Sequence, residues 1–201
     1  MNHIVCVKWG NKYVPEYVNI LKSMIQRHTS VPLQFNCFTE DSSGLDKDIN
    51  VIPFPSSSGI KSWWSKLAMF QPDIGIKGTI LYLDLDVIVF RNIDELFAYN
   101  PSKFMIIRDF NRCRVPDWKQ SNSSVMRWDT GTMNYLWDQF NEDPSKVIGR
   151  MHGDQDWIMR QAGKDINWWP DEWMRSYKWE MLGRKDTKIR KGTKYFFEHP
   201  P

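Results

Sequence analysis

Residues 80–90 read Ile80-Leu81-Tyr82-Leu83-Asp84-Leu85-Asp86-Val87-Ile88-Val89-Phe90, which places two aspartates one residue apart in an otherwise apolar run. A short apolar run of this kind is typical of a strand that is buried on both faces of a parallel sheet. Burying an ionised carboxylate without a partner has a high cost in free energy. We therefore expect Asp84 and Asp86 to lie at the strand end and to face a positive charge, most simply a divalent cation.

The Asp-x-Asp spacing alone does not identify a site, because it occurs at Asp46/Asp48, Asp84/Asp86 and Asp154/Asp156. The first pair lies in a polar stretch that is typical of a solvated loop, and only Asp84/Asp86 closes an apolar strand. In extended backbone, residues i and i+2 project to the same side about 6.5 to 7 Å apart. We therefore expect both carboxylates to converge on one ion. Hard oxygen ligands suit Mg²⁺ or Mn²⁺, and these ions commonly bring phosphates with them.

Length and charge narrow the class of protein. The chain has 201 residues, of which 41% are hydrophobic, which is enough for one well-buried core and predicts a single domain. The net charge of +3 and the pI near 8.7 fall short of the basic excess of a dedicated nucleic-acid binder, so we expect no nucleic-acid partner. Basic residues become dense over residues 175–194, which favours a solvated tail over a phosphate-facing patch.

The cysteines predict a reducing compartment. Cys6, Cys37 and Cys113 are an odd number without metal-type spacing, and two of them fall inside predicted strands. The N-terminus enters a strand without a basic and apolar leader, and no apolar stretch approaches the roughly 20 residues that span a bilayer. We therefore expect a cytoplasmic protein without a transmembrane segment.

The order of predicted elements indicates a parallel α/β sheet with right-handed crossovers. The first half predicts a strand at 3–8, a helix that begins at Pro15, strands at 33–39 and 51–52, and a short helix at 63–70. The second half predicts a short helix at 93–97, strands at 104–108 and 124–128, a helix at 133–140, another that begins near Gly153-Asp154, and an irregular stretch from Trp168. Ligands of such sheets bind at the carboxyl ends of the strands, where we expect Asp84 and Asp86.

Six short motifs follow one another between residue 3 and about residue 180. They are Val5-Cys6-Val7-Lys8-Trp9-Gly10-x-x-Tyr13, Cys37-Phe38-Thr39-Glu40-Asp41, Trp63-Trp64-Ser65-Lys66-Leu67, Leu81-Tyr82-Leu83-Asp84-Leu85-Asp86, Asn122-Ser123-Ser124-Val125-Met126 and Gly153-Asp154-Gln155-Asp156-Trp157. Each motif is weak alone, but six in this order are specific. In these motifs the chain resembles the small nucleotide-sugar glycosyltransferases of the GT-A fold, especially the family-eight-like members with a DxD motif.

The resemblance implies an α/β, single-domain GT-A (Rossmann-like) fold with a mostly parallel central sheet flanked by helices. Residues 1–90 would form the nucleotide-binding half, 91–180 the acceptor and sugar half, and 181–201 a basic C-terminal tail. The implied activity is a metal-dependent transfer of a sugar from a nucleotide-sugar donor to a hydroxyl acceptor on a glycan or another molecule. The donor of such an enzyme would be a UDP-sugar.

The resemblance also implies roles for individual residues. Asp84 and Asp86 would bind Mn²⁺ or Mg²⁺, with Asp86 as the direct ligand and Asp84 shared between the metal and the ribose or sugar. Lys66 would lie near the ribose or the diphosphate. The uracil and ribose would be held at the end of the first strand and beside it, by Val7, Lys8, Trp9, Tyr13 and Thr39.

In the second half, Asn122, Asp154 and Gln155 would face the transferred sugar and the reacting carbon. The relatives usually supply one more metal ligand, a histidine in a Phe-His-Gly-like segment after the last strand. His199, in Phe196-Phe197-Glu198-His199, is the nearest candidate in this sequence but lies in a different motif.

Other interpretations of the same residues stay open. Asp84 would be the nucleophile of a haloacid-dehalogenase-type phosphatase, in which an apolar strand also ends in Asp-x-Asp, although that motif usually opens its domain. A third possibility is a module that binds nucleotide-sugars or glycans without catalysis. Asp154 would serve as a helix N-cap in a purely structural interpretation.

Overall fold

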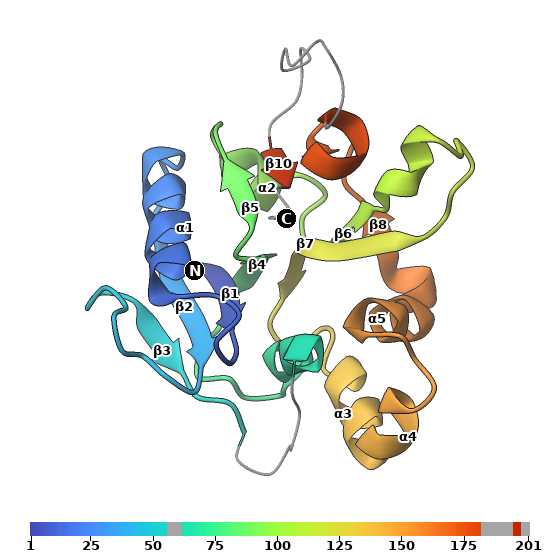
Figure 1. The fold of residues 1–201 in the computed structure, drawn as a ribbon, viewed down its shortest axis with the longest axis horizontal. Helices are drawn as coiled ribbons and strands as arrows, with labels where there is room; N and C mark the ends of the chain where they lie inside the picture. Colours follow the sequence, from blue (N-terminus) through green and yellow to red (C-terminus); the bar gives the residue numbers. More distant parts are fainter. Residues whose placement is uncertain (56–61, 182–194, 198–201) are drawn as a thin grey trace.

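The computed structural model describes residues 1–55, 62–181 and 195–197. Seven strands form one sheet in the order β3-β2-β1-β4-β7-β6-β8. The registers make β3, β2, β1 and β4 parallel to one another, while β7 runs antiparallel to both of its neighbours. β8 is parallel to β6, so β7 alone runs against the other strands of this sheet. The sheet is therefore mostly parallel, and helices flank it (Figure 1). The predicted α/β fold class is confirmed.

The first half follows the predicted alternation of strands and helices closely. It contains β1 (Asn2–Lys8), α1 (Pro15–Arg27), β2 (Leu33–Thr39), β3 (Asn50–Ile52), the 3₁₀ helix η1 (Ser62–Phe70) and β4 (Thr79–Leu83). Helix α1 begins at Pro15 as predicted, since the fixed φ of proline suits the first helical position and its missing N–H is not needed there.

The run from Ile80 to Phe90 is not one strand, which corrects the prediction. β4 ends at Leu83, and a turn follows in which the Val87 N–H donates to the Asp84 carbonyl, 3.1 Å away. The next strand, β5 (Val87–Val89), belongs to a separate sheet. A continuous strand would carry both carboxylates into the buried sheet, whereas the turn leaves them at the carboxyl end of β4, outside the sheet. Asp84 and Asp86 therefore lie on a turn, and the extended spacing assumed for them was wrong.

The second half places the remaining strands of the main sheet beside β4. It contains α2 (Asp94–Ala98), β6 (Phe104–Arg108), η2 (Phe110–Cys113), β7 (Ser121–Asp129), α3 (Tyr135–Glu142), α4 (Pro144–Ile148), α5 (Asp154–Ala162), η3 (Gly163–Asp165) and β8 (Ile166–Trp168). The strand predicted at 124–128 is longer by three residues at its start, and this extension brings Asn122 and Ser123 into the sheet.

The stretch predicted to be irregular after Trp168 contains regular structure. It holds β9 (Met174–Ser176), a π-helical turn η4 (Tyr177–Met181) and β10 (Tyr195–Phe197). A small sheet, in the order β5-β10-β9, brings the end of the chain back beside the segment that follows Asp86. Most of the predicted basic tail, at 182–194, and His199 lie outside the described residues.

The core has two parts, one on each face of the main sheet, because successive side chains of a strand point to opposite faces. Ile4 and Leu81 pack with Leu21 of α1 in one part. Val5 and Tyr82 pack in the other with η1, α3 and α5, whose buried residues include Leu67, Phe140 and Ile158. Figure 1 shows α1 and α2 above the sheet and α3, α4 and α5 below it. The sheet is therefore covered on both faces, and the carboxyl ends of its strands remain accessible to ligands.

Cys6 and Cys37 are buried in neighbouring strands, and Cys113 is exposed; all three are free thiols. In the described part of the chain, every helix is too short or too polar to span a bilayer.

Candidate active site

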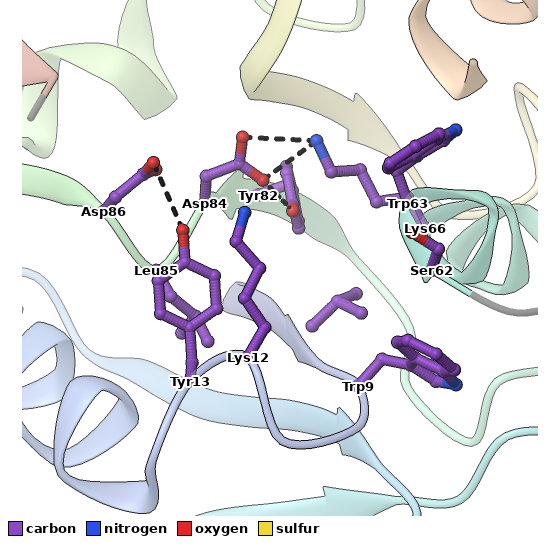
Figure 2. A pocket seen from close by; sticks show the side chains of 11 residues that line it. Trp9, Lys12, Tyr13, Ser62, Trp63, Lys66, Tyr82, Asp84, Leu85 and Asp86 are labelled. Carbon is purple, nitrogen blue, oxygen red and sulfur yellow. Dashed lines mark hydrogen bonds and ion pairs between the residues drawn. The ribbon is translucent and has the colours of Figure 1, made fainter. Parts of the chain in front are cut away.

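A pocket of about 230 Å³ opens where β1 and β4 end side by side. Its wall is formed by Val7, Trp9, Lys12, Tyr13, Ser62, Trp63, Lys66, Tyr82, Asp84, Leu85 and Asp86. The strands are parallel neighbours, so their carboxyl ends deliver the loop after β1 and the aspartate turn after β4 to the same edge. Figure 2 shows Tyr13 and Asp86 on one side of the pocket, Trp9 and Trp63 on the other, and Lys12 and Lys66 between them.

Lys66 ties the aspartate turn to the start of α5. Its Nζ lies 2.9 Å from Oδ1 and 3.2 Å from Oδ2 of Asp84, and 3.6 Å from Oδ2 of Asp154. The same ammonium donates to the Ser123 hydroxyl at 3.3 Å, and the Tyr82 hydroxyl donates to Asp84. One cation thus joins carboxylates that are 70 positions apart in the sequence.

Burial and charge act against each other in this cluster. Burial by itself lowers the pKa of Lys66, but the carboxylates of Asp154, Asp84 and Asp86 outweigh it and raise the pKa above its usual value. Burial raises the pKa of Asp154, which is 5% exposed, although Lys66 opposes the change. Burial and the neighbouring Asp84 raise the pKa of Tyr82. Lys66 is therefore held as a cation, which is what keeps two carboxylates together in a buried place.

Asp86 lies beside Asp84, on the side of the pocket where Tyr13 also lies (Figure 2). It accepts a hydrogen bond of 3.3 Å from the hydroxyl of Tyr13, a residue of the loop between β1 and α1. Burial and the nearby carboxylates of Asp86 and Asp84 raise the pKa of Tyr13, so its hydroxyl stays protonated and donates. The backbone holds the turn in place as well, because the Asp84 N–H donates to the Ser124 carbonyl at 2.9 Å.

The three residues expected to face the transferred sugar lie on β7 and α5. Asp154 accepts from the Ser123 hydroxyl at 3.0 Å, and the Gln155 side chain accepts from the Ser123 N–H at 3.2 Å. The Asn122 side chain instead accepts from the N–H of Ser124 at 3.0 Å. The structure therefore brings Asp154 to Lys66. Hydrogen bonds with Ser123 of β7 hold the side chains of both Asp154 and Gln155.

Two residues expected at the nucleotide lie outside the pocket wall. Lys8 and Thr39 are paired across β1 and β2 and are 4% and 2% exposed. The Thr39 hydroxyl is engaged by the backbone of Asp41, to whose carbonyl it donates at 3.0 Å. By contrast, the pocket is lined by Val7, Trp9, Tyr13, Lys66, Asp84 and Asp86.

Sequence reasoning did not assign Lys12, Trp63, Tyr82 or Ser123 to the site. Three of them occur inside the motifs quoted above, but nothing in a motif says which side chain enters a pocket. Lys12 lies in the loop after β1, where its Nζ is 5.0 Å from the centre of the Tyr13 ring. The positive charge of Lys12 could have indicated a site residue, because the end of the strand before it was already expected to hold a nucleotide.

A divalent ion bound together with a nucleotide takes one or two carboxylates from the protein and completes its shell with phosphate oxygens and water. Asp84 and Asp86 supply two carboxylates on one wall of the pocket, so the residues fit such an ion. Within residues 1–55, 62–181 and 195–197, no group of three or more His, Cys, Asp or Glu side chains is placed to hold a metal. Among the described residues, the protein side chains therefore do not form a complete coordination shell for a metal.

Comparison with solved structures identifies the fold. The galactosyltransferase LgtC, solved in complex with donor and acceptor sugar analogs, matches all of this chain and 88% of its own with a TM-score of 0.67 at 12% sequence identity. The protein has the fold of the GT-A glycosyltransferases. No protein-family model matches the sequence, and no curated protein matches it.

Two further structures show how this fold varies in length. The apo form of mouse xyloside xylosyltransferase 1 matches over 98% of both chains, with a TM-score of 0.59 and 18% identity. The glycosyltransferase GlyE of Streptococcus pneumoniae TIGR4 matches 87% of this chain with a TM-score of 0.63 and 14% identity. This chain spans only 47% of the length of GlyE.

Proposed function

We propose that this protein transfers a sugar from a nucleotide-sugar, a UDP-sugar, to a hydroxyl group of a glycan or another acceptor. The observation that carries the proposal is the turn Asp84-Leu85-Asp86 on the wall of a pocket at the carboxyl ends of β1 and β4. In a GT-A fold this edge is where a nucleotide would enter. The similarity to structures of glycosyltransferases, LgtC among them, supports the same activity.

The nucleotide would lie along the end of β1. Val7, Trp9 and Tyr13 offer apolar and aromatic surface for the uracil and ribose, with Lys8 and Thr39 supporting the strand ends behind them. Lys12 extends into the pocket (Figure 2), and no carboxylate of the described residues forms an ion pair with it. Its charge would therefore meet the diphosphate.

Asp86 and Asp84 would hold Mn²⁺ or Mg²⁺ against the diphosphate. When bound, the ion would neutralise the negative charge that grows on the diphosphate as the sugar–phosphate bond breaks. Lys66 would support this metal site by holding the Asp84 carboxylate in position, because it already forms ion pairs with Asp84 and Asp154. A leaving group stabilised in this way needs no proton.

Asp154, Gln155 and Asn122 would act on the sugar side of the reaction. What remains there is to position the acceptor hydroxyl and to stabilise positive charge on the sugar ring, which carboxylates and amides do well. Asp154 is placed for this role by Ser123 and Lys66. The free thiols of Cys6, Cys37 and Cys113 favour a reducing compartment, and we propose that the protein is cytoplasmic.

The test is a thermal-shift panel of UDP, ADP, GDP and UDP-sugars, with Mn²⁺ and with EDTA, joined to an assay of donor hydrolysis. A ligand that binds only the folded state raises the melting temperature, so UDP with Mn²⁺ should raise it most. Asp86→Ala should remove the Mn²⁺ dependence without unfolding the protein, while Asp138→Ala, an exposed carboxylate on α3, should keep it.

Three results would redirect the proposal. Nucleotide affinity that is the same in EDTA would falsify the role of the metal. Release of phosphate from simple phosphomonoesters, with a phosphoaspartate trapped at Asp84, would replace the transferase by a phosphatase. Binding of UDP-sugar without hydrolysis or transfer would instead indicate a binding module.

A further inference from the structure

Trp63 is a large apolar side chain that the fold leaves uncovered. Its exposed fraction is 56%, and it lines the pocket that also contains Asp84 and Lys66. In the described residues the other tryptophans are more buried. An isolated apolar side chain on a surface needs no explanation, but this indole stands on the wall of the candidate active site. Its exposed face is therefore available to a ligand.

The position of the indole is set by two features. Trp63 and Lys66 are three residues apart in the 3₁₀ helix η1, and residues at this spacing lie on the same side of such a helix. The indole therefore stands beside the ammonium group that contacts Asp84 and Asp154. It is also held from the α5 side, because a Cβ atom at Gly153 would lie 3.2 Å from its Nε1 and 3.3 Å from its Cδ1.

Gly153 directly precedes Asp154, and its φ of 177° is extended backbone that any residue adopts. The glycine is thus needed here for space and not for conformation. Its missing side chain lets the indole edge lie against the start of α5. Trp63 consequently bridges the element that carries Lys66 and the element that carries Asp154 and Gln155.

We propose that Trp63 is a carbohydrate-stacking residue, whose indole holds the C–H face of a pyranose ring beside Asp154. This inference rests on the proposed function and adds where the sugar lies. A flat aromatic face is suited to the apolar side of a sugar ring, while the ring hydroxyls stay free for polar partners such as Lys66, which lines the same pocket. The ring belongs either to the donor or to the acceptor, since both meet at this point.

The place of Trp63 beside the start of α5 favours a sugar over a nucleobase. Tyr13, which is proposed to hold the uracil or ribose, lies across the pocket from Trp63, whereas Trp9 lies on the same side as Trp63 (Figure 2). The indole lies instead against Gly153, which directly precedes Asp154, and three positions before Lys66 in η1. A nucleobase stacked on Trp63 would occupy the place that the reacting sugar needs beside Asp154.

The test compares Trp63→Ala and Trp63→Phe with the wild type by calorimetry, using UDP, UDP-glucose, UDP-galactose and UDP-xylose in Mn²⁺. In a second arm, saturation-transfer NMR measures contact of the methyl glycosides of glucose, galactose and xylose with the UDP-bound protein. Tyr177→Ala is the matched control, because Tyr177 is an aromatic side chain 40% exposed on a different element.

If the donor sugar stacks on Trp63, Trp63→Ala should weaken the UDP-sugar roughly tenfold relative to UDP alone. If the acceptor stacks there, UDP-sugar affinity should hold while the methyl-glycoside signal is lost. In both cases Trp63→Phe should recover part of the effect, and Tyr177→Ala should behave as the wild type.

The inference is overturned if Trp63→Ala weakens UDP as much as UDP-sugar, which would show a nucleobase at the indole. It is equally overturned if neither arm changes. These outcomes are distinct from failure of the proposed function itself, in which the wild-type protein would bind neither UDP nor any UDP-sugar.

Discussion

At the scale of single residues, Asp154 combines two possible duties of a carboxylate. It is the first residue of α5, where a negative charge favours the helix dipole, and it also contacts Lys66 and Ser123 in a nearly water-free place. Asp156, two residues later, lies in the same helical turn but accepts from the backbone of His152 instead. This pair allows the structural duty to be separated from the chemical one.

We expect Asp154→Asn to lower donor hydrolysis and transfer by roughly ten- to a thousandfold, with UDP affinity nearly unchanged. The amide keeps the size of the side chain and can still accept from Ser123, but it loses the charge that we propose acts on the sugar. Steady-state kinetics and calorimetry measure the two effects, and Asp156→Asn serves as the control. The N-cap of α5 is Gly153 and not Asp154, which corrects the structural interpretation of that residue. If Asp154→Asn melts early while its residual activity is intact, Asp154 only stabilises the start of α5.

Lys12 allows a second prediction at this scale. Its charge faces the pocket and has no carboxylate partner within 4.0 Å among the described residues, whereas Lys66 is already committed to Asp84 and Asp154. Lys12→Gln should therefore weaken UDP binding about tenfold, equivalent to about 1.4 kcal/mol. The loss should shrink at high salt, because salt screens an exposed charge.

The matched control for Lys12→Gln is Lys47→Gln, which removes an exposed charge from the loop before β3. Calorimetry at low salt and at about 0.5 M salt, where charges are screened within a few ångströms, gives the two affinities. A loss that is equal for both variants would reduce Lys12 to a contributor to overall charge.

At the scale of elements, β7 does more than extend the sheet. Ser123 and Ser124 in its first half hold Asp154 and the aspartate turn. Arg127 in its second half is only 1% exposed and has its guanidinium directed at backbone carbonyls. These carbonyls belong to the end of α2 and the loop that follows it: Leu96, Phe97, Tyr99, Asn100 and Lys103.

Arg127→Met should destabilise the protein by about 2 to 4 kcal/mol, because it leaves one buried and several partly buried carbonyls without a donor. Denaturant unfolding monitored by circular dichroism measures the change. Arg91→Met, at an exposed arginine, should change stability by less than about 0.5 kcal/mol. Equal stability of Arg127→Met and the wild type would mean that water replaces the guanidinium at all of these carbonyls.

At the scale of the whole molecule, one sheet separates two apolar clusters that share no covering element. Leu21 of α1 fills one cluster and Phe140 of α3 fills the other, and both are 0% exposed. Because adjacent residues of each strand contribute to opposite clusters, a strand cannot leave one cluster without leaving the other. The two faces should therefore unfold together.

Leu21→Ala and Phe140→Ala should each lower the free energy of unfolding, by about 2 to 5 kcal/mol, and each should keep a single transition. Circular dichroism and tryptophan fluorescence should give the same midpoint for each variant. Ile20→Ala, at a side chain 56% exposed on α1, is the control for Leu21→Ala. Two separate midpoints in either core variant would show that the faces unfold independently.

The sequence by itself determined the fold class and most of the pocket wall. Alternating strands and helices are local patterns, and their periods are written in neighbouring residues. Asp84 and Asp86 were proposed as site residues because a carboxylate is costly inside an apolar run, and Asp154 and Gln155 were proposed because their motif resembles that of the glycosyltransferases. The strand at 33–39 and the strand at 104–108 have their predicted bounds.

Only the tertiary structure decided how residues far apart meet. Asp84 leaves β4 in a turn because the sheet around it is buried, and β5 then pairs with β10, more than 100 residues later in the chain. The contacts of Lys66 with Asp154 and of Trp63 with Gly153 depend on how η1 and α5 pack below β4 and β7. Such contacts leave no local pattern, since they are set by the packing of whole elements and not by the propensities of the residues within them.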